Sequence, residues 1–358
     1  MGWLDGGMHV RAACRGAPCG PRRLVLLASI ALASTGTAAT AAMQEASVSV
    51  PAVVADMQGR IVQRDVSVAL LHDDATPVPR PLLVILHGRA TDTKGRAALD
   101  RGRYTQNAQW FAERGFQVAI PARIGYGKTG GADVEDTGAC EHQRYEPAFE
   151  AIGRQTRAVL AALRTRADVA KDRAVVVGLS FGGVGAIALA ARPPPGVQAI
   201  INFAGGGGGN PDTRPADPCD ADTLRDLLAR YGETARIPSL WIYAENDRYF
   251  GVKYPLAWFG AFVGSGGKGE FALMPAFGND GHQLFTQAPD IWASRVDAFL
   301  RSVGFAVDAR PVRASAPGRI QAPPPPPPSR PPPPPAPIAP EATPPTRAPG
   351  PATHEAAP

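Results

Sequence analysis

The sequence predicts a protein of the α/β class, with a mostly parallel central sheet and helices on both of its faces. Segments with strand and helix patterns alternate along the middle of the chain, which is typical of that arrangement. Several strand candidates are short and wholly apolar, such as residues 81–86 and 174–177, as expected for strands covered on both faces. The pattern extends over residues 45–304 of a 358-residue chain, a suitable length for one domain.

The first half of this domain begins with a strand at residues 65–70, where polar and apolar side chains alternate. That alternation predicts an antiparallel strand at the edge of the sheet. The apolar strand 81–86 follows, and helical spacing predicts a helix over 104–114 that ends at Gly115. The pattern then predicts a strand at 116–120, stopped by Pro121, and a long helix at 145–166 with its apolar residues on one face.

The second half of the domain continues the alternation of strands and helices. Its first strand, 174–177, is followed by a helix of small residues that is halted by a run of prolines. The expected elements after that strand are helix 183–191, strands 197–203 and 239–243, helix 255–263, strand 271–274 and a closing helix at 291–303.

The two ends of the chain are unlike globular protein. Residues 1–42 are expected to be a signal peptide, because Arg22-Arg23 precede an apolar stretch at 24–33 and small residues follow at 40–42. The alternative is an uncleaved membrane anchor, although the apolar stretch is short for a bilayer span. A signal peptide predicts a periplasmic or secreted protein.

Residues 306–358 are expected to form a disordered, proline-rich tail, because such a segment buries no apolar surface and lacks backbone donors. It is either a spacer that contacts the cell wall, a ligand for a proline-binding module, or a dispensable low-complexity segment. The net charge of +5 is modest and the arginines are scattered, so nucleic-acid binding is not expected.

The four cysteines divide into two pairs. Cys14 and Cys19 lie in the expected signal peptide and leave with it. Cys140 and Cys219 remain, and an even number of cysteines in an exported chain predicts a disulfide that braces the rim of the active site. The alternative is two free, buried thiols.

The most informative motif is Gly-Leu-Ser-Phe-Gly at residues 178–182, directly after the strand 174–177. A buried strand that ends in G-x-S-x-G and continues into a helix predicts a nucleophile elbow, which exposes the hydroxyl of Ser180 above the sheet. The flanking glycines are required because a Cβ there would collide with the neighbouring strand or helix. The alternative is a glycine-rich turn without catalytic function.

A serine nucleophile needs an imidazole to accept its proton. Among the six histidines, His282 is the candidate, because it lies in a glycine-rich loop between the last strand and the last helix. Loops at that end of the sheet project over the position of the serine. The alternative is a surface histidine with ordinary hydrogen-bond partners.

The histidine needs a carboxylate that fixes its tautomer. Asp247 follows directly after the strand 239–243 and is the candidate for that role, with Glu245 as the competing carboxylate. Asp280, beside His282, is expected to cap its own loop instead.

The oxyanion of the tetrahedral intermediate needs two backbone donors. One is expected from the amide of Phe181, and the other from the loop after residue 86, where Arg89 or Ala90 donates. His87 is expected to hold this loop in shape and not to act as a base.

Two glycine-containing segments complete the expected site. Tyr126, in Gly-Tyr-Gly, is expected either to line the pocket or assist the oxyanion, or to belong to a simple turn. The glycine run 205–209 is expected to flank the acyl or alcohol pocket.

Taken together, His87-Gly88, the serine motif at 178–183, Asp247 and the Asp280-Gly281-His282 loop resemble the α/β-hydrolase fold, in which serine, acid and histidine follow in this order. The segments 245–247 and 281–282 are similar to dienelactone hydrolases and to prolyl-oligopeptidase-type catalytic domains. The resemblance covers residues 66–300. Dienelactone hydrolases carry a cysteine where Ser180 stands, so the serine indicates an esterase.

The expected activity is therefore that of an exported serine hydrolase that cleaves a small-molecule carboxylic ester through an acyl-enzyme. Ser180, His282 and Asp247 are its expected triad, the amides of Phe181 and Arg89 its oxyanion donors, and no metal or organic cofactor is needed. Two alternatives stay open: a serine peptidase of the prolyl-oligopeptidase type, and a non-catalytic, wall-associated binding protein on a hydrolase scaffold.

Overall fold

The computed structural model describes residues 42–99 and 104–307. Residues 1–41 of the expected signal peptide and residues 308–358 of the expected proline-rich tail lie outside the described residues. Within the described ranges, no helix is long and apolar enough to cross a membrane.

The strands of the described residues form one sheet in the order β1-β2-β4-β3-β5-β6-β7-β8. β1 pairs antiparallel with β2 and β2 with β4, whereas every other pair is parallel. The mostly parallel sheet expected from the sequence is thereby confirmed. The strands are β1 (Met43–Ala55), β2 (Ile61–Asp73), β3 (Arg80–Leu86), β4 (Gln117–Ala122), β5 (Val169–Leu179), β6 (Val197–Phe203), β7 (Ser239–Ala244) and β8 (Gly269–Met274).

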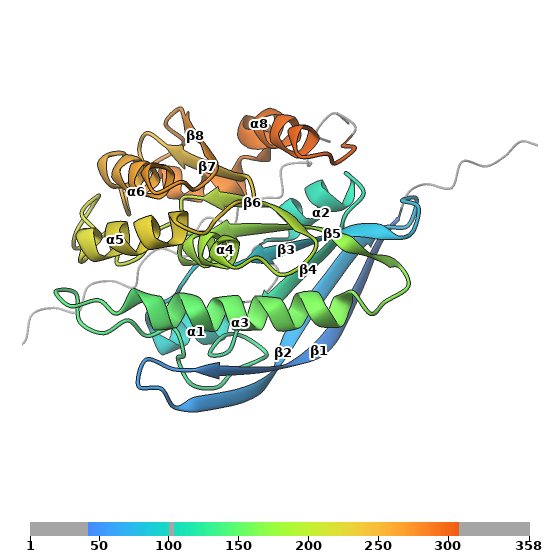
Figure 1. Cartoon of the computed structure of the whole chain (residues 1–358), viewed down its shortest axis with the longest axis horizontal. Helices are drawn as coiled ribbons and strands as arrows, with labels where there is room; N and C mark the ends of the chain where they lie inside the picture. Colours follow the sequence, from blue (N-terminus) through green and yellow to red (C-terminus); the bar gives the residue numbers. More distant parts are fainter. Residues whose placement is uncertain (1–41, 100–103, 308–358) are drawn as a thin grey trace, which may run out of the picture. The chain divides into compact units, whose positions relative to one another are not determined.

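Helices cover both faces of this sheet (Figure 1). α2 and α8 lie together on one face, where Trp110 and Trp292 meet edge to face with ring centroids 4.7 Å apart. α3, α4, α5 and α6 follow one another across the other face. The helices are α1 (Thr93–Ala98), α2 (Thr105–Ala112), α3 (Tyr145–Leu163), α4 (Phe181–Ala191), α5 (Ala221–Gly232), α6 (Lys253–Gly264), α7 (Leu284–Gln287) and α8 (Pro289–Ser302).

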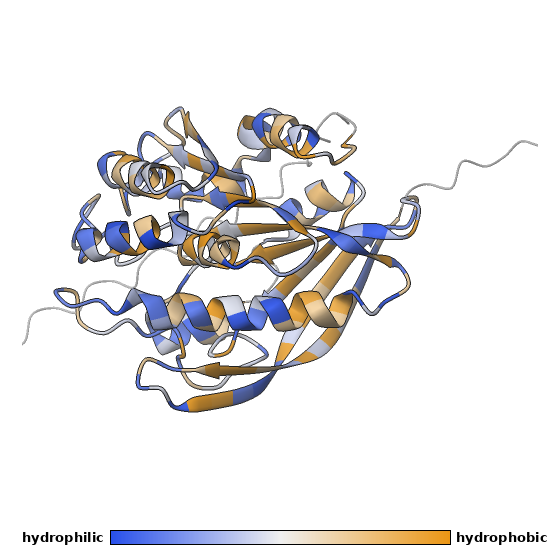
Figure 2. Ribbon diagram, viewed as in Figure 1, coloured by the Kyte–Doolittle hydropathy of each residue, from blue (hydrophilic) through white to orange (hydrophobic). Residues whose placement is uncertain are grey.

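The core lies between the sheet and these two layers of helices. Hydrophobic residues are concentrated on the central strands (Figure 2), and the side chains of Leu82 to Leu86 in β3 are fully buried. Burial of this apolar surface is the main force that holds the layers together. The carboxyl ends of β3, β5 and β6 are level with one another, since Leu86 pairs with Gly178 and Leu179 with Phe203.

The structure also corrects the element predictions. β2 is not the edge strand, because β1 pairs with β2 along the entire length of β2. β1 is therefore the edge strand, and it tolerates Pro51 because an edge strand has unpaired amides on its outer side. β4 does not stop at Pro121 but continues to Ala122, and Pro121 faces Val68 of β2. The helices α1, α5 and α7 were not predicted.

Candidate active site

Ser180 lies at the sharp turn between β5 and α4, with the backbone angles φ 56° and ψ −124°. A positive φ is strained for a residue with a side chain, and such strain clusters at functional sites. A Cβ on Gly178 would overlap the carbonyl of Gly182, and one on Gly182 would overlap the carbonyls of Leu86 and His87. The predicted steric need for both glycines is confirmed, because helix α4 and strand β3 approach the turn this closely.

His282 and Asp247 meet beside this turn. Nδ1 of His282 lies 2.9 Å from Oδ2 of Asp247, and the side chains are 6% and 0% exposed. The other carboxylate oxygen of Asp247 accepts the main-chain N–H groups of Tyr249 (2.8 Å) and Phe250 (3.0 Å). Because a carboxylate only accepts hydrogen bonds, the Asp247 contact favours a proton on Nδ1 of His282 and leaves Nε2 able to accept one.

The competing acids lie elsewhere. Glu245 is exposed, and its main-chain N–H donates to the carbonyl of Met274. Oδ1 of Asp280 accepts the main-chain N–H groups of Arg248 and His282, both at 3.0 Å, so the prediction that Asp280 caps its loop is confirmed. The carboxylate in contact with His282 is therefore that of Asp247.

A pocket of about 280 Å³ opens on Ser180 and His282. Tyr249 forms one wall and stacks on the imidazole of His282, with ring centroids 4.0 Å apart. The other wall includes Gly88, whose Cβ, if it had one, would lie 3.3 Å from Cβ of Ser180. This close approach places the loop after β3 directly against the serine.

A second, larger cleft of about 850 Å³ also reaches Ser180. Phe181 and the glycines 206–209 line it, which confirms that this glycine run flanks the site. Cys140 and Cys219 form a disulfide in its wall, so the predicted bridge and its place at the rim are both confirmed. Ser180 thus lines both the pocket and the larger cleft.

The loop His87–Ala90 and the start of α4 present the expected oxyanion donors. Gly88 donates its N–H to the hydroxyl of Tyr104 at 3.2 Å. Within the described residues, the N–H groups of Arg89 and Phe181 donate to no acceptor. Phe181 is the first residue of α4, where N–H groups have no partner inside the helix. Both N–H groups are thus without an acceptor among the described residues.

His87 has a structural function, as predicted. Its Nδ1 lies 2.7 Å from the carbonyl of Gly88, and its Nε2 accepts the N–H of Arg123 at 3.2 Å. These two contacts require a neutral ring with the proton on Nδ1, since a carbonyl accepts and an N–H donates. His87 therefore has no free nitrogen with which to act as a base.

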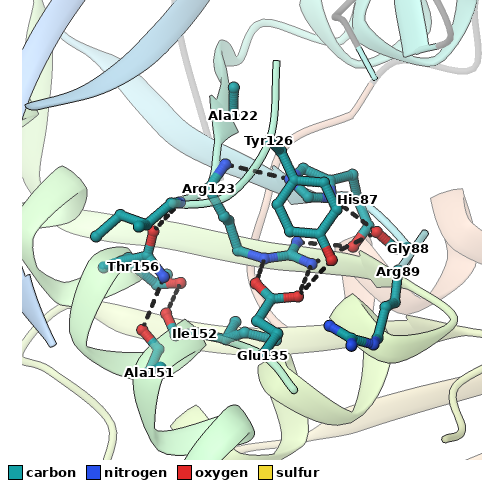
Figure 3. Close-up of polar contacts among 12 residues, drawn as sticks. His87, Gly88, Arg89, Ala122, Arg123, Tyr126, Glu135, Ala151, Ile152 and Thr156 are labelled. Atoms are coloured by element: carbon teal, nitrogen blue, oxygen red, sulfur yellow. Dashed lines mark hydrogen bonds and ion pairs between the residues drawn. The ribbon is translucent and has the colours of Figure 1, made fainter. Parts of the chain in front are cut away.

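Tyr126 lines neither pocket at Ser180, so the expectation that it lines the pocket was wrong. Tyr126 is fully buried, and its hydroxyl donates to Glu135 at 2.9 Å. Glu135 in turn pairs with Arg123 beneath the loop His87–Ala90 (Figure 3). Sequence analysis missed the functions of Arg123, Glu135 and the pocket residues Tyr104 and Tyr249, because none of them belongs to a catalytic motif.

No group of three or more His, Cys, Asp or Glu side chains within residues 42–99 and 104–307 is arranged to hold a metal ion. The chemistry that the site offers comes from side chains and backbone: a strained serine, an imidazole bonded to a buried carboxylate, and two available amides. Such a set is suited to acyl transfer through a covalent intermediate.

Comparisons with known proteins agree with the fold. Residues 77–247 match the family model described as "Serine aminopeptidase, S33". A search of curated proteins finds no match. An esterase of Pyrococcus furiosus has a similar structure, with a TM-score of 0.50 and 14% identity over 73% of this chain and 90% of that one.

Two further solved structures are similar. A proposed dienelactone hydrolase of Klebsiella pneumoniae is 12% identical over 74% of this chain and 98% of that one, with a TM-score of 0.49. A cold-adapted esterase from an Arctic intertidal metagenomic library is 16% identical over 73% and 94% of the two chains, also with a TM-score of 0.49.

The sheet order, the serine turn between β5 and α4, and the matched family model together define an α/β hydrolase. The chain has the α/β-hydrolase fold, as its sequence motifs suggested, and the family model that matches residues 77–247 is one of hydrolases.

Proposed function

We propose that this chain is an exported serine hydrolase that cleaves carboxylic esters with Ser180, His282 and Asp247. One observation carries the proposal: the strained Ser180 shares a pocket with His282, and the imidazole of His282 is bonded to the buried Asp247. The Pyrococcus furiosus neighbour is named as an esterase, which is in keeping with this proposal, since the two folds are alike.

In the proposed reaction, Oγ of Ser180 attacks the ester carbonyl while Nε2 of His282 takes the hydroxyl proton. The amides of Phe181 and Arg89 stabilise the oxyanion. The imidazolium, held by Asp247, then donates its proton to the departing alcohol oxygen. A water molecule next attacks the acyl-enzyme, with His282 again taking and returning a proton, which releases the acid and restores the serine.

The alternative is a serine peptidase, and the match to a family described as serine aminopeptidases favours it. The same groups would serve, with an amine as the leaving group. We expect p-nitrophenyl esters of increasing acyl length to be turned over, and aminoacyl-p-nitroanilides to be turned over far more slowly. Anilide turnover without ester turnover would replace the esterase proposal with the peptidase.

A non-catalytic binding protein is the remaining alternative. A fluorophosphonate probe separates it from both enzymes, because the probe labels only an activated serine. Labelling of the wild type, but not of a Ser180 variant, is the expected result. A protein that takes up no label would be a binder, and its contact with the cell wall through residues 306–358 would then be its main activity.

Export is part of the proposal, and a disulfide suits an oxidising compartment. A mature protein recovered from the periplasm or medium with residues 1–42 removed is the expected result. Recovery of the full-length chain in the cytoplasm would contradict export. The proline-rich tail is proposed to act as a spacer outside the cell.

The disulfide itself is expected to stabilise the fold. Cys140 and Cys219 are 79 residues apart, and closing a loop of that length contributes about 4 kcal/mol on the chain-entropy model. The double variant Cys140→Ser, Cys219→Ser should therefore unfold at a lower urea concentration than the oxidised wild type. The reduced wild type is the control and should match the variant; identical midpoints for oxidised and reduced protein would contradict the expectation.

A further inference from the structure

We propose that the buried ion pair between Arg123 and Glu135 positions a donor of the oxyanion hole, because it fixes the orientation of the peptide group that carries the Arg89 N–H. The inference rests on the proposed serine-hydrolase function. It assigns a function to residues that contact neither the serine nor the pocket. It also gives Tyr126 a function, which is to support the residues that hold this peptide group (Figure 3).

The geometry begins with the two carbonyls of the loop after β3. Nη1 of Arg123 donates to the carbonyl of His87 at 2.7 Å, and Nη2 lies 3.5 Å from the carbonyl of Gly88. Nδ1 of His87 donates to the same Gly88 carbonyl at 2.7 Å. Both carbonyls are therefore turned toward the buried guanidinium and the imidazole.

The direction of the Arg89 amide follows from the planarity of the peptide bond. In a trans peptide the C=O and the next N–H point in opposite directions. Since the Gly88 carbonyl is held on the Arg123 side, the Arg89 N–H must face away from it. The N–H of Gly88 likewise faces Tyr104, which lines the pocket with Ser180. If the Gly88–Arg89 peptide rotated by half a turn, the Gly88 carbonyl would face the oxyanion in place of the Arg89 N–H.

The guanidinium is itself held by Glu135. Nη2 of Arg123 lies 2.9 Å from Oε2 of Glu135, Nε bonds the other oxygen, and both side chains are 0% exposed. Burial alone lowers the pKa of Arg123, but the neighbouring acidic groups, Glu135 first, together raise it, so the guanidinium keeps its charge. Removing one partner of such a pair leaves an uncompensated buried charge.

Tyr126 supports both Glu135 and His87. Burial, and then the charge of Glu135, raise the pKa of the Tyr126 phenol, so its hydroxyl stays protonated and donates to Oε2 of Glu135. Its ring also meets the imidazole of His87 edge to face, with centroids 4.5 Å apart. Tyr126 therefore supports both groups that hold the Gly88 carbonyl.

The same segment also holds the side chain of Arg89. The carboxylate of Asp133, two residues before Glu135, accepts both Nη1 (2.9 Å) and Nη2 (3.0 Å) of Arg89. Burial lowers the pKa of Arg89, but the neighbouring acidic groups, Asp133 first, together raise it, so the guanidinium keeps its charge. Residues 133–135 thus fix the backbone of the oxyanion loop through one arginine and its side chain through another.

The test is the variant Glu135→Gln, assayed with p-nitrophenyl butyrate and with butylboronic acid as an analogue of the tetrahedral intermediate. We expect kcat to fall by about 10-fold to 100-fold while KM changes less than about threefold, because an oxyanion donor acts mainly in the transition state. The inhibition constant of the boronic acid should rise by the same factor as kcat/KM falls.

The matched control is Asp297→Asn. Asp297 forms a second buried ion pair with Arg114, with a distance of 2.6 Å; the Arg114 side chain is 2% exposed and that of Asp297 is 8% exposed. Neither residue lines the pocket or the cleft at Ser180. This variant removes the same kind of charge, so it should lower the melting temperature without changing kcat by more than about twofold. Equal kcat values in the Glu135 and Asp297 variants would overturn the inference, as would a change confined to KM.

A second variant covers the case in which Glu135→Gln does not fold. Tyr126→Phe removes one hydroxyl and leaves the ion pair intact, and its kcat should fall by roughly threefold to tenfold, again with weaker boronic acid binding. An unchanged kcat in folded Tyr126→Phe would overturn the inference in that case. Failure of the wild type to hydrolyse any ester would instead refute the proposed function, so the two failures are distinguishable.

Discussion

Replacing Ser180 with alanine is expected to abolish the proposed ester hydrolysis, with kcat lower by about 10⁴-fold to 10⁶-fold, as for the loss of the nucleophile in serine proteases. The fold should be retained, because the alanine side chain keeps the Cβ that already occupies the turn and lacks only the hydroxyl that faces the pocket. Steady-state hydrolysis of p-nitrophenyl butyrate measures the effect, and the melting temperature checks the fold.

The control for this variant is Ser302→Ala. Ser302 ends α8, and its hydroxyl donates to the carbonyl of Phe299, so its loss leaves the pocket unchanged. Activity and fluorophosphonate labelling should both match the wild type. Substantial labelling of the Ser180→Ala protein would show that another nucleophile performs the reaction, and the proposed site would have to be abandoned.

The second large effect is expected from Asp247→Asn, with kcat lower by about 10⁴-fold. The asparagine oxygen can still accept the N–H groups of Tyr249 and Phe250. Its NH₂ group would then face Nδ1 of His282, where the carboxylate oxygen now lies at 2.9 Å. Because two donors cannot bond each other, the proton of the imidazole would move to Nε2, and His282 could no longer accept the proton of Ser180.

The matched control is Glu245→Gln, since Glu245 was the other carboxylate that the sequence offered. Its side chain is exposed and no contact joins it to His282, so kcat should stay within about twofold of the wild type. Hydrolysis rates measured at several pH values on both sides of neutrality separate a true loss of activity from a shift of the optimum. A greater loss in the Glu245 variant than in the Asp247 variant would contradict the proposed acid.

Much of the fold could be predicted because its signals are local. The buried strands β3, β5 and β6 contain continuous apolar runs, and such runs predict strands covered on both faces. β1 was missed because its neighbour β2 already looks like an edge strand, and only the pairing shows which of the two is outermost. α5 was missed because it follows a glycine-rich loop, and it packs mainly against α6 rather than against the sheet.

The sequence by itself determined the class of protein, the serine at its turn, and the order of serine, acid and histidine. The turn depends in part on short-range sterics, because a Cβ on Gly178 would overlap the carbonyl of Gly182 four residues later. The disulfide partners also followed from the sequence, because two cysteines remain once the expected leader is set aside.

The tertiary structure alone decided which carboxylate meets His282 and what holds the loop after β3. Asp247 and Glu245 are two residues apart on the same turn, and only the direction of the chain after β7 buries one and exposes the other. Arg123 lies 36 residues from His87, and no periodic pattern links residues so far apart. Such contacts arise when strands distant in sequence become neighbours in the sheet, so they are properties of the packed fold and not of any segment within it.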